Sequence, residues 1–451
     1  MMNIAAISTP HGLGGIAVIR VSGPGATTIV DSHFRPFREG HTLATRATHT
    51  LTFGQFLSAN GEVLDEVVCS LYRAPHSFTG EDVVEISCHG SLYIQQEIMN
   101  TLLAAHRPET ATPLANNTMN SLRMAEPGEF TRRAFANGRM DLSQAEAVAD
   151  LIAAQTSAQH RVAMGQMKGS ITRQLDALHD KLLKLTSLLE LELDFSEEDV
   201  EFADRTELLT LANEIDREVM RLANSFAAGN AIRNGIPVAI IGAPNVGKST
   251  LLNALLKDDR AIVSDIQGTT RDLVEDTITL GGFLFRFIDT AGIRHTDDKV
   301  EQLGIERSKL AAEKAQIIIL LTEPGVPFPK IPTHEGQTIV RITNKTPEFQ
   351  ALNNIGVPEL EAKLIGHAKN TLSSEGNDGA VLITNLRHKQ MLDQAHRDIT
   401  LVIQGLEQHL SGDLVAEDLR AVIASLNAIL GRSITSQDTL NNIFKNFCVG
   451  K

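Results

Sequence analysis

The feature that most constrains this chain is a short glycine-bearing segment, G-A-P-N-V-G-K-S, at residues 242–249. It fits the pattern G-x-x-x-x-G-K-[ST], and it lies between an apolar run of strand type and a helix-like segment, the context that this motif requires. Glycines let the backbone turn tightly, so that successive N–H groups and the helix N-terminus point at phosphate oxygens. The segment therefore predicts a phosphate-binding loop, in which Lys248 contacts the β and γ phosphates and Ser249 binds Mg²⁺.

Length and composition limit the class of protein further. At 451 residues the chain is too long for one core and predicts about three domains. Its three cysteines, Cys69, Cys88 and Cys448, are widely spaced, which indicates a reducing compartment without structural disulfides. Because no signal peptide or membrane-spanning run is visible, we expect a soluble, cytoplasmic protein. A net charge of −14 and the lack of tryptophan argue against a general nucleic-acid-binding surface.

The pattern of apolar residues changes along the chain. Residues 1–121 mix short β-type runs with Gly and Pro turns, which indicates a compact α+β domain. Residues 122–234 and 375–451 are helical in pattern, whereas residues 235–374 hold the phosphate-binding loop in an α/β pattern. Because two helical stretches flank the α/β unit, we expect a nucleotide-binding domain inserted into an all-α domain whose halves pack together.

Two apolar stripes support the helical assignment. Spacings of three and four predict core packing in a helix bundle, although a partner-binding coiled coil has similar spacing. The first stripe consists of Leu175, Leu178, Leu182, Leu185 and Leu189. The second consists of Leu392, Ile399, Ile403, Leu406 and Leu410, and Gly412 is the expected helix stop after it.

Two polar segments follow the phosphate-binding loop in the order that a GTPase needs. The first, at residues 264–272, contains threonines that can close over Mg²⁺ and the γ-phosphate. The second reads D-T-A-G at residues 289–292. There Asp289 is expected to hold Mg²⁺ through water, and the N–H of Gly292 to sense the γ-phosphate.

Strand signals complete this domain. Gly281-Gly282 predicts a two-residue hairpin turn of the primed type, and two later apolar runs predict central strands, the second ending at Asn344-Lys345. The order and spacing of these signals predict a Ras-like P-loop G domain. Its expected nucleotide-binding residues are Asn245, Val246, Gly247, Lys248, Ser249, Thr250, Ser264, Asp265, Ile266, Gln267, Gly268, Thr269, Thr270, Asp289, Thr290, Ala291, Gly292, Asn344 and Lys345.

Segments at both ends of the chain make a resemblance specific. They are I-A-A-I-S-T-P at residues 4–10, G-G-I-A-V-I-R at 14–20, F-T-G-E-D at 78–82, E-P-G-E-F-T-R-R-A-F at 126–135 and F-C-V-G-K at 447–451. Together with the G-domain motifs they resemble the MnmE (TrmE) family of tRNA-modification GTPases over the whole chain. The resemblance implies a three-domain protein that dimerises through its N-terminal domains.

The resemblance also implies a reaction. Members of the family work with an FAD- and NADH-using partner of the MnmG type, as a heterotetramer, to build a carboxymethylaminomethyl or aminomethyl group on C5 of the wobble uridine of certain tRNAs. The one-carbon unit comes from a tetrahydrofolate derivative, such as (6S)-5-formyltetrahydrofolate, bound in the N-terminal domain. The residues that match the family's folate site are Arg20, Glu85, Arg139 and Lys451.

The chemistry of these side chains suits a folate. Arg20 or Arg139 can pair with the glutamate carboxylates, and Glu85 can accept hydrogen bonds from the pterin. Cys448 matches a family cysteine proposed to take part in the modification chemistry, and a small buried hydrophobic residue is an equally good interpretation of it.

The hydrolytic site implied by the resemblance differs from that of Ras-like enzymes. Ile293 stands where those enzymes carry a water-orienting glutamine, and Glu301 matches the family's water-orienting glutamate. The family uses K⁺ in place of an arginine finger, since a cation beside the β–γ bridge neutralises developing charge. The expected ligands are Asn245, Ser264, Ile266 and Thr269 for K⁺, and Ser249 and Thr270 for Mg²⁺. The expected catalytic residues are Glu301, Lys248 and Cys448.

One motif departs from the family pattern. Pro347 follows Asn344-Lys345-Thr346 where the guanine-reading motif Asn-Lys-x-Asp places an aspartate that accepts hydrogen bonds from guanine N1 and N2. Losing that contact costs about 2–4 kcal/mol of guanine preference, although Glu348 can substitute in part if the loop shifts. The next base-contacting motif, Ser-Ala-Lys in the family, reads Q-A-L at residues 350–352. We therefore expect nucleotide turnover with doubtful guanine selectivity.

Two other functions stay open at this point. A non-enzymatic switch or scaffold, ordered by nucleotide binding, fits the changed base motif but not the retained Glu301 and Asn245. A ribosome-assembly GTPase usually carries a basic RNA-binding appendage, and the acidic balance of this chain argues against one.

Overall fold

The computed structural model describes residues 2–105, 121–194, 205–257, 276–288, 309–334, 336–373, 381–432, 437–445, 447 and 450. Close contacts divide the chain into two compact units. The first consists of residues 1–149 together with residues 430–451, and the second of residues 150–429. Both ends of the chain therefore belong to one unit.

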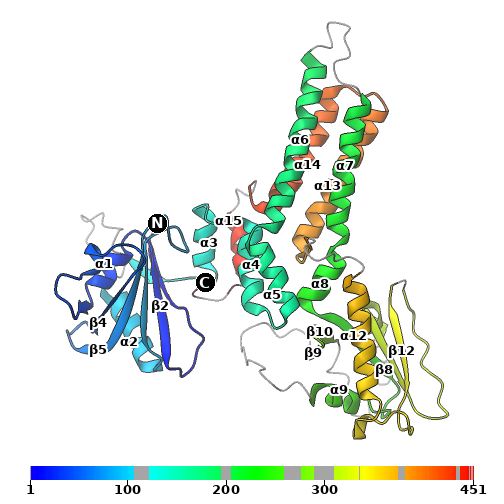
Figure 1. Cartoon of the computed structure of the whole chain (residues 1–451), viewed down its shortest axis with the longest axis horizontal. Coiled ribbons are helices and arrows are strands. Elements are labelled where there is room, and N and C mark those ends of the chain that lie inside the picture. The colour runs from blue at the N-terminus through cyan, green and yellow to red at the C-terminus, as the bar shows by residue number, and fades with distance from the viewer. Residues whose placement is uncertain are drawn as a thin grey trace. The chain divides into compact units, whose positions relative to one another are not determined.

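A seven-stranded sheet forms the body of the first unit (Figure 1). The strand order is β3-β4-β5-β6-β2-β1-β7, antiparallel except for the parallel pair of β1 and β7. The strands are β1 (Asn3–Ile7), β2 (Ile16–Ser22), β3 (Phe34–Pro36), β4 (Thr50–Leu57), β5 (Val63–Tyr72), β6 (Val83–His89) and β7 (Leu122–Met124). The strands expected around residues 16–21 and 83–86 are thus present.

Alternation along the strands creates the core of this sheet. On β5, Val67, Cys69 and Leu71 all point inward, as expected for a strand with one buried face. They pack in one apolar cluster with residues of α1 (Ala26–Asp31) and α2 (Leu92–Ala105). Cys69 and Cys88 are free and buried, and burial raises the pKa of the Cys88 thiol to about 11.

Helices from both pieces of the first unit pack together. They are α3 (Glu129–Ala136), the start of α4 (Leu142–Ala153) and α15 (Gln437–Phe444). Gly128 precedes α3 with a φ of 65°, and a Cβ there would lie 2.8 Å from the carbonyl oxygen of Phe444. Only glycine fits this position, since both the backbone conformation and the close approach exclude a side chain.

A buried ionic network holds α3 to the strands. The guanidinium of Arg133 donates to Glu129 and to Glu81, each at 3.0 Å, and to the carbonyl oxygen of Met2 at 2.7 Å. Arg123 donates to both oxygens of Glu129 at 2.7 Å. Burial alone would raise the pKa of Glu129, but the hydrogen bond from Arg123 and the neighbouring positive charges outweigh it and lower the pKa.

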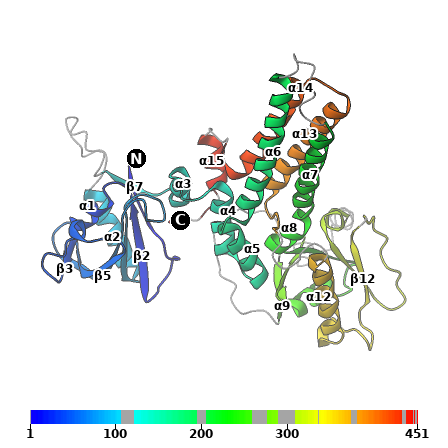
Figure 2. The same cartoon turned by 45° about the horizontal axis from the view of Figure 1, so that its top comes forward.

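Long helices form one part of the second unit. They are α5 (Ser157–Met167), α6 (Ser170–Asp194), α7 (Arg205–Asn224), α8 (Phe226–Asn234), α13 (Leu386–Glu407) and α14 (Gly412–Leu430). Figures 1 and 2 show α6, α7, α13 and α14 side by side. The expected leucine stripe lies on α6, and all five of its leucines are buried. Core packing in a bundle is therefore confirmed for this stripe.

The helical stretches before and after the inserted domain in sequence pack on each other. On α13, His396 Nδ1 lies 2.6 Å from Asp216 Oδ1 of α7, and Leu392 and Ile399 are buried. The expected role of Gly412 as a helix stop is wrong. Helix α13 ends earlier, because His409 takes a φ of 55° and Leu410 N–H donates to the carbonyl of Gly405 at 2.9 Å. Gly412 instead begins α14.

The rest of the second unit is the expected α/β domain. Its sheet has the order β12-β11-β8-β10-β9, with all neighbours parallel except the β9–β10 hairpin. The elements are β8 (Ile236–Gly242), α9 (Lys248–Lys257), β9 (Asp276–Leu280), β10 (Phe283–Phe287), β11 (Ile317–Thr322), β12 (Thr338–Thr343) and α12 (Val357–Ser373). Gly281 and Gly282 form the predicted hairpin turn, with φ of 58° and 85°.

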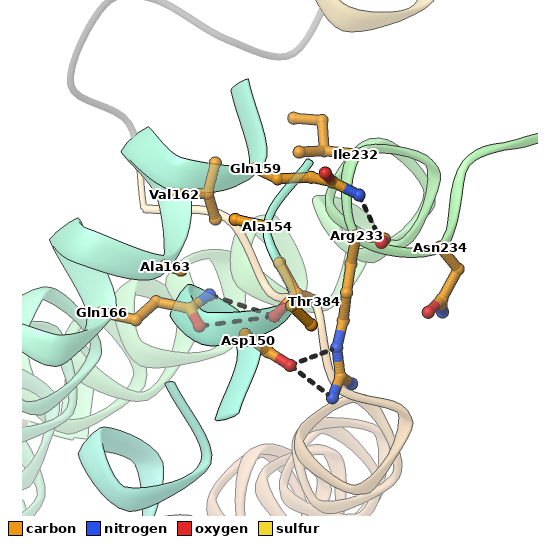
Figure 3. Close-up of a pocket in the computed structure, with 11 residues that line it drawn as sticks. Asp150, Ala154, Gln159, Val162, Ala163, Gln166, Ile232, Arg233, Asn234 and Thr384 are labelled. Atoms are coloured by element: carbon orange, nitrogen blue, oxygen red, sulfur yellow. Dashed lines mark hydrogen bonds and ion pairs between the residues drawn. The ribbon is translucent and has the colours of Figure 1, made fainter. Parts of the chain in front are cut away.

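The chain enters and leaves this domain through two connections, which contact helices α4 and α5. A cavity of about 210 Å³ lies there, lined by residues of α4, α5 and α8 and by Thr384. Figure 3 shows the side chains that line it. Asp150 pairs with the Arg233 guanidinium at 2.7 Å, on the outgoing connection. Gln166 donates to the carbonyl of Leu382 at 3.0 Å and to Thr384 Oγ1 at 3.2 Å, on the returning one. The inserted domain is thus tied to the helices by both of its connections.

None of the described helices combines the length and apolar character needed to cross a bilayer.

Candidate functional site

The predicted phosphate-binding loop connects β8 to α9, in the strand–loop–helix arrangement expected from its sequence. Gly242 ends β8, and a Cβ there would lie 2.4 Å from the carbonyl oxygen of Leu321 on β11. Gly247 has a φ of 97°, and its carbonyl accepts from the N–H of Leu251 at 2.9 Å in the first turn of α9. Both glycines are therefore required by the geometry of the loop.

Lys248 lies at the start of α9, and its ammonium folds back onto the loop. Its Nζ donates to the carbonyl oxygens of Gly242 and Ala243, each at 2.8 Å. Burial lowers the pKa of this amine. A partly desolvated ammonium beside the loop interacts more strongly with phosphate oxygens than an ammonium in bulk water does.

The other residues of the loop differ in exposure. Asn245 is exposed and has a φ of 62°, whereas the side chain of Val246 is buried. Ser249 and Thr250 are half-buried on the first turn of α9. A hydroxyl at the N-terminus of a helix is placed to bind Mg²⁺ beside phosphates, which fits the expected role of Ser249.

Asn344 connects the Asn344-Lys345 segment after β12 to the phosphate-binding loop. Its side chain is buried, and Nδ2 donates to the carbonyl of Val246 at 2.8 Å. Its Oδ1 accepts from the N–H of Ala351 at 3.1 Å, in the short helix η5 (Ala351–Asn353). The structure thus brings together motifs about a hundred residues apart in sequence.

Lys345 makes a second bridge to the same loop. Its Nζ donates to the carbonyl of Asn245 at 3.3 Å and forms an ion pair with Glu323. Glu323 directly follows β11, which pairs with β12 up to Thr343, so the carboxylate lies beside the motif. Sequence reasoning missed Glu323, although a carboxylate immediately after a buried parallel strand is a usable signal.

Several expected site residues lie outside the described part of the chain. These are Ser264, Asp265, Ile266, Gln267, Gly268, Thr269, Thr270, Asp289, Thr290, Ala291, Gly292, Glu301, Cys448 and Lys451. Of the expected K⁺ and Mg²⁺ ligands, the structure therefore describes Asn245 and Ser249.

A second group of expected residues meets on the sheet of the first unit. Arg20 on β2 lies directly opposite Glu85 on β6, and the guanidinium Nη2 is 2.7 Å from Glu85 Oε1. The same guanidinium lies 5.5 Å from the ring centroids of Phe78 and Phe130. It also donates to the carbonyl of Gly450, at 3.5 Å.

The C-terminal tail is held at this place by a further contact. Ser8 Oγ donates to the carbonyl of Gly450 at 3.1 Å. Arg139 is exposed, and its side chain packs at Gly80, in the turn before β6, where a Cβ would lie 3.1 Å from Arg139 Cγ. The structure therefore gathers Arg20, Glu85 and the tail, with Arg139 placed on the turn that leads into β6.

Comparisons with known proteins identify the family of this chain. The family model described as "MnmE helical domain" matches residues 142–448, and that described as "GTP-binding protein TrmE N-terminus" matches residues 3–139. The chain is 48% identical over 480 residues to a tRNA modification GTPase MnmE of Parabacteroides distasonis, with 100% of both chains covered. It is 45% identical over 481 residues to that of Bacteroides fragilis strain YCH46, and 46% identical over 480 residues to that of Bacteroides thetaiotaomicron, with 99% of each chain covered. With matches that run from its first strand to its C-terminal tail, the chain belongs to the MnmE (TrmE) family of tRNA-modification GTPases.

Proposed function

We propose that this chain hydrolyses GTP in the service of tRNA modification. The observation that carries the proposal is the phosphate-binding loop fastened on one side by Lys248 and on the other by Asn344 and Lys345. Preorganised donors aimed at phosphate oxygens are the main catalytic resource of P-loop enzymes. Mg²⁺ suits this loop because the Ser249 hydroxyl lies on the first turn of α9.

The finer chemistry of hydrolysis is part of the same proposal. K⁺ takes the place of an arginine finger, with Asn245, Ser264, Ile266 and Thr269 as its ligands, and Glu301 orients the attacking water. In support, Asn245 occupies the exposed turn of the loop in a left-handed conformation, where its side chain is open to a cation. A K⁺ held by these residues would supply positive charge where negative charge develops in the transition state.

We expect the substitution Asn245→Ala to remove the response to K⁺. The unmodified chain should hydrolyse GTP at least tenfold faster in K⁺ than in matched Na⁺ buffer, since the cation neutralises charge that develops in the transition state. The variant should turn over GTP equally in both salts. Steady-state phosphate release measures both rates, and Asn213→Ala, an exposed asparagine on α7, is the matched control. A variant that keeps the full K⁺ response would show that Asn245 is not a ligand.

The first unit, in this proposal, binds the tetrahydrofolate that provides the one-carbon unit. Arg20, Glu85, Arg139 and Lys451 are the contacts, in line with the pairing of Arg20 and Glu85 on adjacent strands and the position of Gly450 against Arg20. Contacts with two aromatic rings restrict the Arg20 guanidinium, whose N–H groups can pair with a carboxylate of an anionic ligand.

The substitution Arg20→Ala should weaken binding of 5-formyltetrahydrofolate at least tenfold. It removes a charge-assisted contact and leaves the Glu85 carboxylate without its ion-pair partner, so the site becomes more negative toward an anionic ligand. Isothermal titration calorimetry gives the dissociation constant. GTP hydrolysis should be unchanged, and Arg35→Ala, at an exposed position on β3, should alter neither quantity. Equal affinity of the Arg20→Ala variant would remove this residue from the proposed site.

The proposed assembly follows from the family. The chain acts in the cytoplasm as a homodimer with an MnmG-type partner, and tRNA is the molecule modified, at C5 of its wobble uridine. Residues 1–121 provide folate binding and dimerisation, residues 122–234 and 375–451 the helical domain, and residues 235–374 the G domain.

A further inference from the structure

The base and the phosphates of a nucleotide would contact different loops of this domain. In parallel α/β sheets, ligands bind at the carboxyl ends of the strands. Here the phosphate-binding loop follows β8, and residues 344–350 follow β12, two strands away in the same sheet. With the phosphates at the helix end of the first loop, the segment after Asn344 lies on the base side.

Guanine offers two adjacent donors on one edge, N1–H and the 2-amino group. A protein distinguishes it from hypoxanthine, which differs only by lacking that amino group, with an acceptor placed to receive a hydrogen from it. Leaving such an acceptor unpaired is what penalises the wrong base. Pro347 has no side-chain acceptor, and it is exposed after Lys345 and Thr346.

Among the described residues, three polar side chains close to Pro347 in the loop or bonded to it already have partners. The carboxylate of Glu323 forms the ion pair with Lys345. Thr346 Oγ1 donates to the carbonyl of Thr343 at 3.3 Å and accepts from the N–H of Phe349 at 3.1 Å. Gln350 Oε1 accepts from Asn353 at 2.7 Å. Each of these acceptors stabilises the loop itself.

Glu348 is held where the turn places it. Thr346 N–H donates to the carbonyl of Phe349 at 3.1 Å, and Phe349 N–H donates back to that of Thr346 at 3.3 Å. Phe349 is buried in the core of the domain, and a Cβ on Gly356 would lie 2.6 Å from the carbonyl oxygen of Glu348. Moving the exposed Glu348 into the position of residue 347 would break the two hydrogen bonds between Thr346 and Phe349. It would also move the Phe349 side chain out of the core.

We propose that this site does not read the 2-amino group, so that inosine nucleotides bind it as tightly as guanosine nucleotides. The inference rests on the proposed function, because it assumes that the loop binds a nucleoside phosphate. It widens the substrate class from GTP to GTP and ITP alike. The base is positioned by the framework of Asn344, Lys345 and η5 rather than by a carboxylate.

Competition against N-methylanthraniloyl-GDP tests the proposal without depending on turnover. The full chain, in Mg²⁺ and K⁺, is titrated with GDP and with IDP, and the two dissociation constants should agree within about threefold, in line with a site that makes no hydrogen bond to the 2-amino group. The substitution Pro347→Asp should then raise the preference for GDP over IDP at least tenfold, since it places the missing acceptor. Pro327→Asp, at another exposed proline of this domain, is the charge-matched control and should leave the ratio near one.

Each result decides something different. A tenfold or larger preference of the unmodified chain for GDP would overturn the proposal, and the same titration of Glu348→Gln and Glu323→Gln would then identify the acceptor. A ratio that stays near one in Pro347→Asp, with an unchanged circular dichroism spectrum, would overturn the assignment of the effect to residue 347. If N-methylanthraniloyl-GDP does not bind at all, the proposed nucleotide function itself fails.

Discussion

Replacing Lys248 with alanine is expected to lower the rate of GTP hydrolysis by about 10²–10³-fold, the usual effect of removing one donor that stabilises transition-state charge. The ammonium is partly buried and already lies within the loop, bonded to the carbonyls of Gly242 and Ala243. Because it is held there in advance, little reorganisation is needed when charge develops on the phosphates. Single-turnover hydrolysis with excess protein measures the chemical step directly.

Two controls separate catalysis from folding. Lys330→Ala, at an exposed lysine of the same domain, should keep the full rate. Thermal unfolding of Lys248→Ala should match that of the unmodified chain, because the loop carbonyls freed by the substitution can bond to water. A rate within a factor of three of the unmodified chain, with intact folding, would mean that another cation carries this role.

Replacing Arg133 with alanine is expected to destabilise the first unit by about 3–5 kcal/mol, the range measured when one partner of a buried ion pair is removed. The side chains of Arg133 and Glu129 are 6% and 3% exposed, so the variant would leave the carboxylates of Glu129 and Glu81 without this guanidinium in a site shielded from water. For a unit of this size ~1 kcal/mol shifts the midpoint of thermal unfolding by about 2–4 °C. Scanning calorimetry should therefore show the transition of this unit about 10 °C lower.

The exposed Arg35→Ala variant is the control for this measurement, and we expect a shift within about 1 °C, as for most surface substitutions. The transition of the second unit should not move in either variant, since Arg133, Glu129 and Glu81 all belong to the first. If Arg133→Ala unfolds at the original temperature, the ion pairs of Arg123 and Arg132 with Glu129 compensate for the lost guanidinium.

Local patterns predicted the parts of the structure that depend on neighbours in sequence. The phosphate-binding loop, the Gly281-Gly282 turn and the leucine stripe of α6 are all specified within a few turns of chain, and all are present. The prediction that Gly412 ends a helix was wrong because a glycine is compatible with either end of a helix. A left-handed His409 ends the helix first, and glycine is equally tolerated where the next helix begins.

The contacts that complete the sites depend on distant residues. The ion pair of Glu323 with Lys345 and that of Asp150 with Arg233 join segments 22 and 83 residues apart. Neither pair belongs to a repeating pattern, so nothing in the neighbouring sequence marks it. The network at Arg133 likewise needs Glu81 and the Met2 carbonyl, which the sheet brings to α3 only in the folded unit.

The tail contact at Gly450 has a consequence for biosynthesis. Ser8 and Gly450 are 442 positions apart, and the whole second unit lies between the two pieces of the first. At about 5–20 residues per second, a ribosome takes tens of seconds to pass from the end of one piece to the start of the other. The sheet around Arg20 therefore leaves the ribosome tens of seconds before α15 and the tail residue that contacts it. A chain that stops before Gly450 carries the sheet of the first unit and the whole second unit, but it lacks the carbonyl that accepts from Arg20 and Ser8.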